Sequence, residues 1–441
     1  MTSVVAAVRR ALLGPHLREL HFYFGTVGLS DIGGALVASL SRDGDRVAAF
    51  ETAFAAKIGV GGAVAFGAGR MALYAILESL EIGPGDEVII PAFTCVVVPN
   101  AIRYRGAIPV FADIDRHSWN ISPANVERAV TPRTRAVLAQ HTFGVPCDID
   151  ALTAIARRRG LFVIEDCAHV LGAKWRERTL GTLGDAAFFS FESSKPLTLG
   201  RGGIAVARDA RVLERLRTIQ RGLPEPGRWA SLRSGIRLSV LAFLHRPSIF
   251  RFGKFGAGFL FRMRIFRPNI TMDERRAMRP HGYPARLTHF QAILGSRQIA
   301  NIAEFNGHRS ELSRVYADAV ARLGLAAPTD MSSDTDLPLL RFSFSLPDPA
   351  RAVEHFADRQ IELGRWFDSP VTPVRLTDPN LAMTGYRRGS CPVAEDIADH
   401  CVNFPTDPII TRSDAARIID TLESYLARGE VAPAARFRRD P

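Results

Sequence analysis

Cysteines are few in this sequence, and apolar runs of membrane-spanning length are missing. The five cysteines, Cys95, Cys147, Cys167, Cys391 and Cys401, are dispersed and form no C-x-x-C pair. An odd, dispersed set argues against a disulfide framework or a zinc site and favours a reducing compartment. The chain also opens without a charged and then apolar leader. We therefore expect a cytoplasmic protein with no metal site.

Acidic residues are missing from one segment of the chain. Nine Lys and Arg lie between Glu225 and Asp273, and no Asp or Glu does. Most of the net charge of +11 therefore comes from this segment. Such a local excess argues against a basic face spread over the whole chain, so we expect no nucleic-acid partner.

The length of 441 residues predicts two or more structural units, and 47% hydrophobic with 23% charged residues is typical of a globular protein. We expect an N-terminal arm at 1–45 that begins with an amphipathic stretch at 4–13. A large domain at 46–315 and a smaller α+β domain at 316–441 follow. Residues 225–278 break the pattern of the large domain and are interpreted as an insertion.

Strand and helix patterns alternate along the large domain, and the elements expected after residue 323 belong to the smaller domain. Strands are expected at 64–66, 87–90, 108–111, 136–140, 161–164, 186–191, 203–207 and 339–345. Helices are expected at 46–58, 70–80, 94–104, 123–129, 149–158, 211–221, 350–359, 412–427 and, with a break, 286–323. This alternation predicts an α/β fold in which helices cover both faces of a mainly parallel sheet.

Ligands of such sheets bind beyond the carboxyl ends of the strands, and Asp166 ends a very apolar strand. A buried carboxylate needs a cationic partner, and a protonated pyridine nitrogen is one. A helix N-cap is the alternative role for an Asp at this position.

Lys195 follows the next apolar strand and lies between hydroxyl side chains and a glycine-rich turn. Partial burial would lower the pKa of its amine and free it for Schiff-base chemistry. The alternative is an ordinary surface lysine. Ser190 lies at the end of the same strand, and its hydroxyl is a candidate ligand of a phosphate group. The alternative is that this hydroxyl only hydrogen-bonds a backbone group at the strand end.

Gly67, Ala68 and Gly69 form a turn that opens a helix. The free N–H groups at a helix N-terminus bind phosphate, although a tight connection alone also explains two glycines.

Taken together in this order, these features resemble the DegT/DnrJ/EryC1/StrS family of sugar aminotransferases that use pyridoxal phosphate (PLP). The matching stretches are GAGRMALYAIL, IGPGDEVIIPAFTCVVVPNAI, PVFADID, HTFGVPCDIDAL, VIEDCAHVLGA, LGDAAFFSFESSK, GRGGIAV and CPVAEDIADHCVNFPT. The resemblance covers residues from about 46 to 430 outside the insertion. It implies a fold type I PLP-dependent transferase and a homodimer with active sites at the subunit interface.

The resemblance also implies roles for single residues. Lys195 falls at the position that binds PLP covalently and moves a proton between substrate and cofactor. Asp166 falls at the partner of the pyridine nitrogen. His169 falls at the contact to the 3-hydroxyl side of the ring, where a satisfied core histidine is the alternative. Ser190 and Gly69 fall at phosphate-binding positions.

Four positions depart from the family pattern. Arg70 replaces a Thr or Ser beside the phosphate, and Cys95 replaces an aromatic residue that stacks on the ring. Both remain candidates for cofactor binding. Pro284 replaces an Asn that reaches the neighbouring subunit, and Arg201 replaces the Glu of a G-E-G-G turn.

The implied reaction moves an amino group from an amino acid, glutamate, to a keto group on a nucleotide-linked sugar. A sugar dehydratase of the same fold is an alternative, but such relatives replace the lysine with His. A non-catalytic membrane-associated or regulatory protein with this fold is a second alternative, favoured only by the substitutions at Arg70, Cys95 and Pro284.

Residues 228–267 interleave basic residues with seven phenylalanines. This composition is typical of contact with an anionic membrane surface, which would place the protein at the inner face of the membrane and allow a lipid-linked acceptor. A dimer or domain contact is the equal alternative. Binding of single-stranded nucleic acid would share the composition, but no nucleic-acid module accompanies it.

Overall fold

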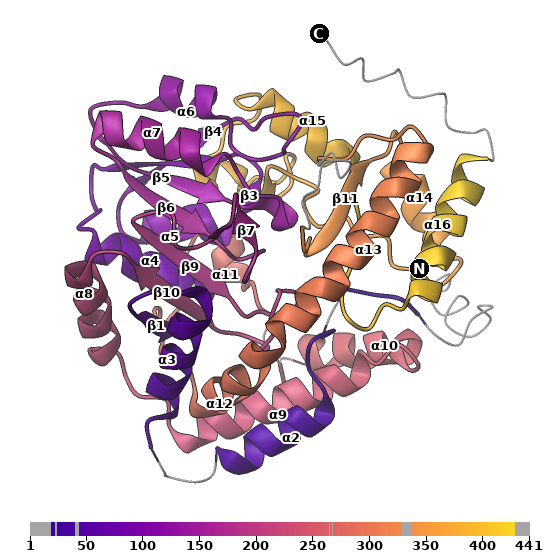
Figure 1. Cartoon of the computed structure of the whole chain (residues 1–441), viewed down its shortest axis with the longest axis horizontal. Coiled ribbons are helices and arrows are strands. Elements are labelled where there is room, and N and C mark those ends of the chain that lie inside the picture. Colours follow the sequence, from indigo (N-terminus) through magenta and orange to yellow (C-terminus); the bar gives the residue numbers. More distant parts are fainter. Residues whose placement is uncertain are drawn as a thin grey trace.

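The computed structural model describes residues 19–22, 24–39, 44–263, 265–266, 268–328 and 337–427 (Figure 1). The amphipathic stretch predicted at 4–13 lies outside the described residues.

A seven-stranded sheet forms the centre of the large domain, in the order β1-β10-β9-β6-β5-β2-β4. Its strands are β1 (Ala63–Phe66), β2 (Glu87–Pro91), β4 (Ile108–Ala112), β5 (Thr134–Gln140), β6 (Phe162–Asp166), β9 (Ala186–Ser190) and β10 (Gly203–Ala207). β10 runs antiparallel to both of its neighbours, and the other adjacent pairs are parallel. The predicted mainly parallel α/β sheet is therefore confirmed.

Helices cover both faces of this sheet, because alternate residues of its strands enter separate apolar clusters. Phe188 packs with the helices of one face, whereas Phe189 packs with those of the other. The helices of the first face are α4 (Gly69–Ser79), α5 (Val97–Tyr104) and α8 (Ala210–Arg221). Those of the second face are α3 (Arg46–Ile58), α6 (Pro123–Ala129), α7 (Ile149–Arg159) and α12 (His289–Gln298). Burial of both faces explains why the strands are continuously apolar.

One predicted helix begins later than expected, one predicted break is found, and one helix was not predicted. The predicted helix at 94–104 begins only at Val97, because Thr94–Cys95 form a short strand, β3, paired with β12 (Val371–Thr372). The predicted break in 286–323 is η2 (Ile299–Asn301), between α12 and α13 (Ile302–Arg322). The arm contains a helix that was not predicted, α2 (Leu29–Ala38).

The C-terminal part is built on a two-stranded antiparallel sheet, β11 (Arg341–Ser345) with β13 (Cys401–Pro405). The helices α14 (Pro349–Ala357), η3 (Leu381–Thr384), α15 (Pro392–His400) and α16 (Arg412–Leu426) complete it. The boundary predicted between 315 and 316 falls inside α13, which packs on both β11 and α16. Two small features complete the large domain. η1 (Thr142–Gly144) lies between β5 and α7, and the hairpin of β7 (Lys174–Trp175) with β8 (Arg178–Thr179) lies between β6 and β9.

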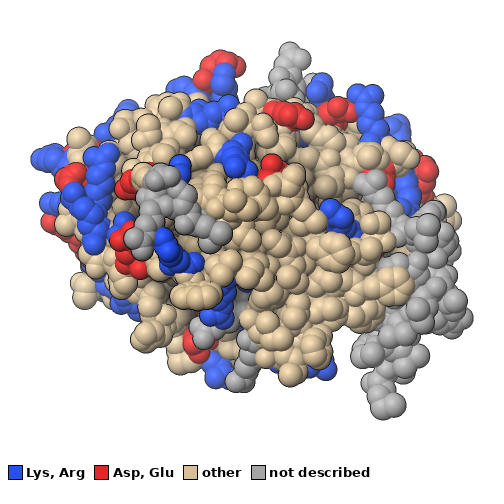
Figure 2. All heavy atoms as spheres, turned by 90° about the horizontal axis from the view of Figure 1, so that it is seen from below, with Lys and Arg blue, Asp and Glu red and all other residues tan. Residues whose placement is uncertain are grey.

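The segment 225–278 folds into α9 (Arg228–Leu244), α10 (Phe250–Arg262) and α11 (Met272–Arg275). α9 lies beside α2 and α12 at the lower edge of Figure 1, with α10 packed on its far end. The outer side of α10 exposes Phe252, Phe255 and Phe259 by 54%, 40% and 60%. Figure 2 shows a broad surface with few charged groups on this side of the molecule. Among the described helices, none has the length and apolar character needed to cross a membrane.

Gly235 allows α9 to approach α2 and α12 closely. A Cβ atom at this position would lie 2.5 Å from Leu36 Cδ1 and 3.2 Å from Phe290 Cδ2. We predict that Gly235→Val destabilises the protein by about 1–3 kcal/mol, because the buried Phe290 ring has no room to move. Thermal unfolding measures the effect. Gly258→Val in α10 is the matched control, since a Cβ there meets nothing within 4 Å. Equal losses in the two variants would contradict the packing described.

Candidate active site

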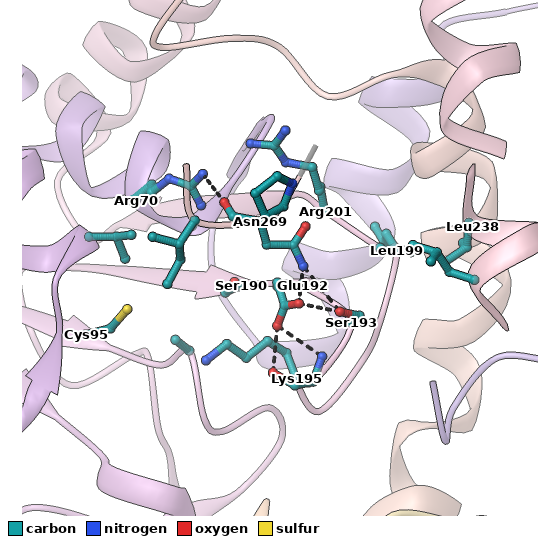
Figure 3. A pocket seen from close by; sticks show the side chains of 18 of the residues that line it. Arg70, Cys95, Ser190, Glu192, Ser193, Lys195, Leu199, Arg201, Leu238 and Asn269 are labelled. Atoms are coloured by element: carbon teal, nitrogen blue, oxygen red, sulfur yellow. Dashed lines mark hydrogen bonds between the residues drawn. The ribbon is translucent and has the colours of Figure 1, made fainter. Parts of the chain in front are cut away.

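A cavity of about 1060 Å³ lies beyond the carboxyl ends of β6 and β9. All seven residues predicted for the site line this cavity, and Figure 3 shows four of them, Arg70, Cys95, Ser190 and Lys195. The seven are Gly69, Arg70, Cys95, Asp166, His169, Ser190 and Lys195. Parallel neighbouring strands bring four of them together, Asp166, His169, Ser190 and Lys195, since β6 and β9 end at the same edge of the sheet. Gly69 and Arg70 reach the cavity from the start of α4, and Cys95 reaches it from β3.

Gly69 brings the N-terminus of α4 against the end of β9. A Cβ atom at Gly69 would lie 2.9 Å from Ser190 Cβ and 3.2 Å from the carbonyl oxygen of Phe189. Only glycine permits this approach, which places the first N–H groups of α4 beside the Ser190 hydroxyl. Backbone N–H groups of a helix N-terminus next to a hydroxyl suit a phosphate group.

Lys195 extends from the loop after β9 into the cavity (Figure 3). Its Nζ lies 4.4 Å from the centre of the Trp366 ring. Burial lowers the pKa of this amine, while the carboxylates of Glu192 and Asp166 act in the opposite direction. The amine is thus easier to deprotonate than an exposed lysine, as the sequence predicted for a nucleophilic amine.

Asp166 is the last residue of β6 and is only 4% exposed. Burial raises the pKa of its carboxyl to about 6, although a hydrogen bond from the Ala168 N–H and the charge of Lys195 oppose the shift. The Ala168 N–H donates to Oδ1 at 2.9 Å in a local turn. Residues 167–173 form no helix, so the alternative role of a helix N-cap is not met. A cation at the carboxylate would remove the cost of its burial.

His169 is buried between aromatic rings and is held in one orientation. Its Nδ1 accepts a hydrogen bond from the Phe143 N–H at 3.0 Å, so the proton of the neutral ring lies on Nε2. The ring stacks on Phe143 and also contacts Trp366. Burial and the charges of Lys195 and Arg341 keep the pKa of His169 well below its usual value. A neutral ring with a proton on Nε2 is a hydrogen-bond donor toward an oxygen.

Arg70 forms an ion pair with the buried carboxylate of Glu274, and its Nη2 donates to the Asn269 carbonyl oxygen at 2.8 Å. The guanidinium therefore links α4 to the segment around α11. It still lines the cavity, so its predicted contact with the cofactor stays a prediction.

Glu192 and Asn269 form a hydrogen-bonded strap across the cavity (Figure 3). The Glu192 carboxylate accepts hydrogen bonds from the hydroxyls of Ser193 and Ser194 and from the Asn269 amide. The Asn269 Oδ1 in turn accepts a hydrogen bond from Arg237 Nη2 at 3.0 Å. These contacts tie the predicted insertion to the Lys195 loop.

Cys95 lies on β3 and lines the cavity, and burial raises the pKa of its thiol. Phe93, the nearby aromatic residue, belongs to a buried cluster with Trp119, Phe143 and Phe367 and is not among the cavity residues. The ring of Trp366, from the C-terminal part, lines the cavity instead.

Four residues of the site were not predicted from the sequence: Glu192, Asn269, Glu274 and Trp366. Asn269 and Glu274 lie about two hundred residues from Arg70, and Trp366 lies far along the chain in the C-terminal part, so no local spacing pointed to them. Glu192 stood in a quoted motif, and its place three residues before Lys195 was the one available signal.

The cavity combines a buried amine, a buried carboxylate and a helix N-terminus suited to a phosphate group. This combination, at the strand ends of such a sheet, defines the class of fold type I PLP enzymes. The donors fit PLP: an amine for its aldehyde, a carboxylate for its ring nitrogen, and N–H and hydroxyl groups for its phosphate. The model of the DegT/DnrJ/EryC1/StrS aminotransferase family matches residues 32–240 and 258–423. The chain belongs to this family.

Relatives of known activity support the same conclusion. GDP-perosamine synthase of Escherichia coli O157:H7 is 27% identical over 88% of this chain and 92% of that protein. The dTDP-3-amino-3,4,6-trideoxy-alpha-D-glucose transaminase of Streptomyces venezuelae is 30% identical over 88% of this chain and 89% of that protein. The crystal structure of S. venezuelae DesV in complex with a ketimine intermediate matches with a TM-score of 0.73 and 28% identity, and it covers 92% of this chain and 98% of that one.

The protein is therefore a PLP-dependent aminotransferase, as the resemblance implied. The alternative of a non-catalytic protein gains no support from these comparisons.

Asp166 gives a pH-dependent prediction. Because its folded pKa is raised from 3.8 to about 6, the folded cofactor-free protein holds a proton that the unfolded chain releases. Stability therefore falls as pH rises through this window, by on the order of 3 kcal/mol. Asp166→Asn keeps the Ala168 contact and removes the charge, so its stability should not fall across the window. Urea unfolding of both cofactor-free proteins at pH values from 4 to 7 tests this. Parallel profiles would contradict the raised pKa.

Proposed function

We propose that this enzyme transfers an amino group from glutamate to a keto group on a nucleotide-linked sugar. The observation that carries the proposal is the cavity in which Lys195 and Asp166 meet. The relatives named above, which act on GDP- and dTDP-linked sugars by their names, support this acceptor class.

In this proposal Lys195 binds the cofactor covalently and then moves the proton on the reacting carbon. Its lowered pKa lets the amine act as a base, and the protonated amine then acts as the acid on return. Trp366 covers this amine and limits the access of water.

The other residues of the site hold PLP, which when bound supplies an electron sink for the reacting carbon. Asp166 would pair with the ring nitrogen and keep it protonated. His169 would donate from Nε2 toward the 3-hydroxyl side. Ser190 and Gly69 would hold the phosphate.

Arg70 and Cys95 would flank the cofactor, with Arg70 near the phosphate and Cys95 near the ring. Within the division proposed from the sequence, 46–315 carries the cofactor residues, and 316–441 contributes Trp366.

Lys195→Ala tests the reaction. We expect the wild type to show the visible absorbance of covalently bound PLP and to lose it when glutamate is added. The variant should bind PLP without that band and show no conversion of the cofactor by glutamate, because no amine remains to move the proton. Spectra of both proteins before and after glutamate measure this. A variant that still converts the cofactor at the wild-type rate would remove Lys195 from the mechanism.

We also propose a cytoplasmic homodimer that contacts the inner face of the membrane through residues 228–267. The apolar side of α10, with the exposed basic Arg262 at its end and no acidic residue in the range, supports membrane contact. A subunit contact would use the same apolar surface, so the test must separate the two. Arg264 and Arg267, two further basic residues of this range, lie outside the described residues.

The double variant Phe255→Ser/Phe259→Ser separates these roles. We expect it to lose binding to vesicles of anionic phospholipid while keeping the dimer mass, because it removes apolar surface from the outer side of α10. Vesicle co-sedimentation and light scattering measure the two properties. Ile108→Ser/Met383→Ser is the control, since both side chains are exposed elsewhere. A double variant that becomes monomeric would assign the surface to the subunit contact instead.

A further inference from the structure

The cavity extends well beyond Lys195, along one side of α9. The α9 residues that line it recur at helical spacing over the whole helix, and His245 continues the row just beyond its end. They are Trp229, Ala230, Arg233, Ser234, Arg237, Leu238 and Leu241. At 1.5 Å per residue, this row is about 24 Å long. A helix of the predicted insertion therefore forms one wall of the reaction cavity.

The part of this wall nearest the strap is cationic, and some of its guanidinium N–H groups have no hydrogen-bond acceptor among the described residues. Arg237 uses Nη2 for Asn269, but its buried Nε has no acceptor among the described residues. The guanidinium of Arg201 makes no hydrogen bond or ion pair with any residue that the structure describes. Figure 3 shows Arg201 and Arg70 extending to the same side of Asn269.

The nearby carboxylates do not supply the missing acceptors. Glu274 is paired with Arg70, and Glu192 accepts from Ser193, Ser194 and Asn269. Burial lowers the pKa of Arg201, and the charges of Arg70 and Arg237 add to this shift. Two guanidinium groups with unused donors in one cavity favour an anion with several oxygens, and a phosphate ester is such an anion.

Beyond Arg237 the wall becomes apolar and aromatic. Leu238 and Leu241 of α9 face the cavity together with Phe261, Ile265 and Phe266. Such a surface suits a nucleobase or a hydrocarbon chain, and it does not suit a free sugar. A ligand that lies along α9 would therefore carry its phosphate next to a flat or apolar group.

We infer that α9 forms the acceptor subsite, in which Arg201 and Arg237 bind a diphosphate ester and the wall from Leu238 to Phe266 receives the group esterified to it. This inference rests on the proposed function, because it takes the ligand to be the amino-group acceptor. The diphosphate is the shared chemistry of two sources, nucleoside diphosphates and isoprenoid diphosphates.

Titration calorimetry of the PLP-loaded enzyme with UDP, farnesyl diphosphate and inorganic diphosphate tests the inference. We expect UDP or farnesyl diphosphate to bind more tightly than inorganic diphosphate, because each adds contacts with the apolar wall. Arg237→Gln and Arg201→Gln should each weaken that binding at least tenfold, since each removes charged hydrogen bonds. Arg228→Gln is the matched control, because Arg228 is exposed on the same helix and does not line the cavity.

Tighter binding of UDP assigns the wall to a nucleotide, and tighter binding of farnesyl diphosphate assigns it to a lipid-linked acceptor. Both results support the diphosphate subsite. Unchanged affinity in Arg237→Gln, or no binding of any of the three probes to the wild type, overturns it. An Arg201→Gln variant that loses PLP affinity alone also overturns it, since Arg201 would then belong to the cofactor phosphate.

The conversion of the cofactor by glutamate keeps this test separate from the proposed function. We expect Arg228→Gln to react with glutamate at the wild-type rate, because Arg228 is exposed and does not line the cavity. A wild type that binds diphosphates but never reacts with glutamate would contradict the proposed function and leave the subsite standing.

Discussion

Lys195 and Asp166 are withdrawn from water at the ends of two adjacent strands, and much of the structure serves to hold them there. Burial disfavours the charged form of both side chains. It therefore lowers the pKa of the Lys195 amine and raises the pKa of the Asp166 carboxyl. The parallel pairing of β6 with β9 brings the two strand ends to one edge. Trp366 and the strap through Glu192 then close the space around the amine. The reactivity of the lysine thus depends on packing by segments from both halves of the chain.

The sheet and its cofactor-facing residues could be predicted because their signals are local. Apolar strands buried on both faces give continuous runs, and a parallel sheet fixes where the residues after each strand meet. Asp166, Ser190 and Lys195 were found by this rule, and Gly69 by its place at a helix start. The helix at 46–58 and the strand at 203–207 have the predicted bounds for the same reason.

The remaining parts depend on contacts between distant segments. The first residues of the predicted helix at 94–104 form β3 because β12, far along the chain, pairs with them. α2 in the arm is packed against α9 and α12, and its short sequence with two glycines gave little sign of a helix. The ion pair of Arg70 with Glu274 explains an arginine at an unusual position, but only the folded chain brings the two together.

Because α9 lies outside the strand ends, the proposed binding residues for the cofactor and for the acceptor come from different segments of the sequence. The residues proposed to hold the cofactor lie mainly at the strand ends, whereas the far wall of the cavity comes from a segment outside the alternating pattern. Changes on the cavity side of α9 that keep Arg237 would alter which acceptor fits, while Asn269 and Glu274 still support Glu192 and Arg70. A lineage of such enzymes would then diversify its products by varying one helix, and engineered exchange of the apolar positions of α9 between relatives would transfer acceptor preference.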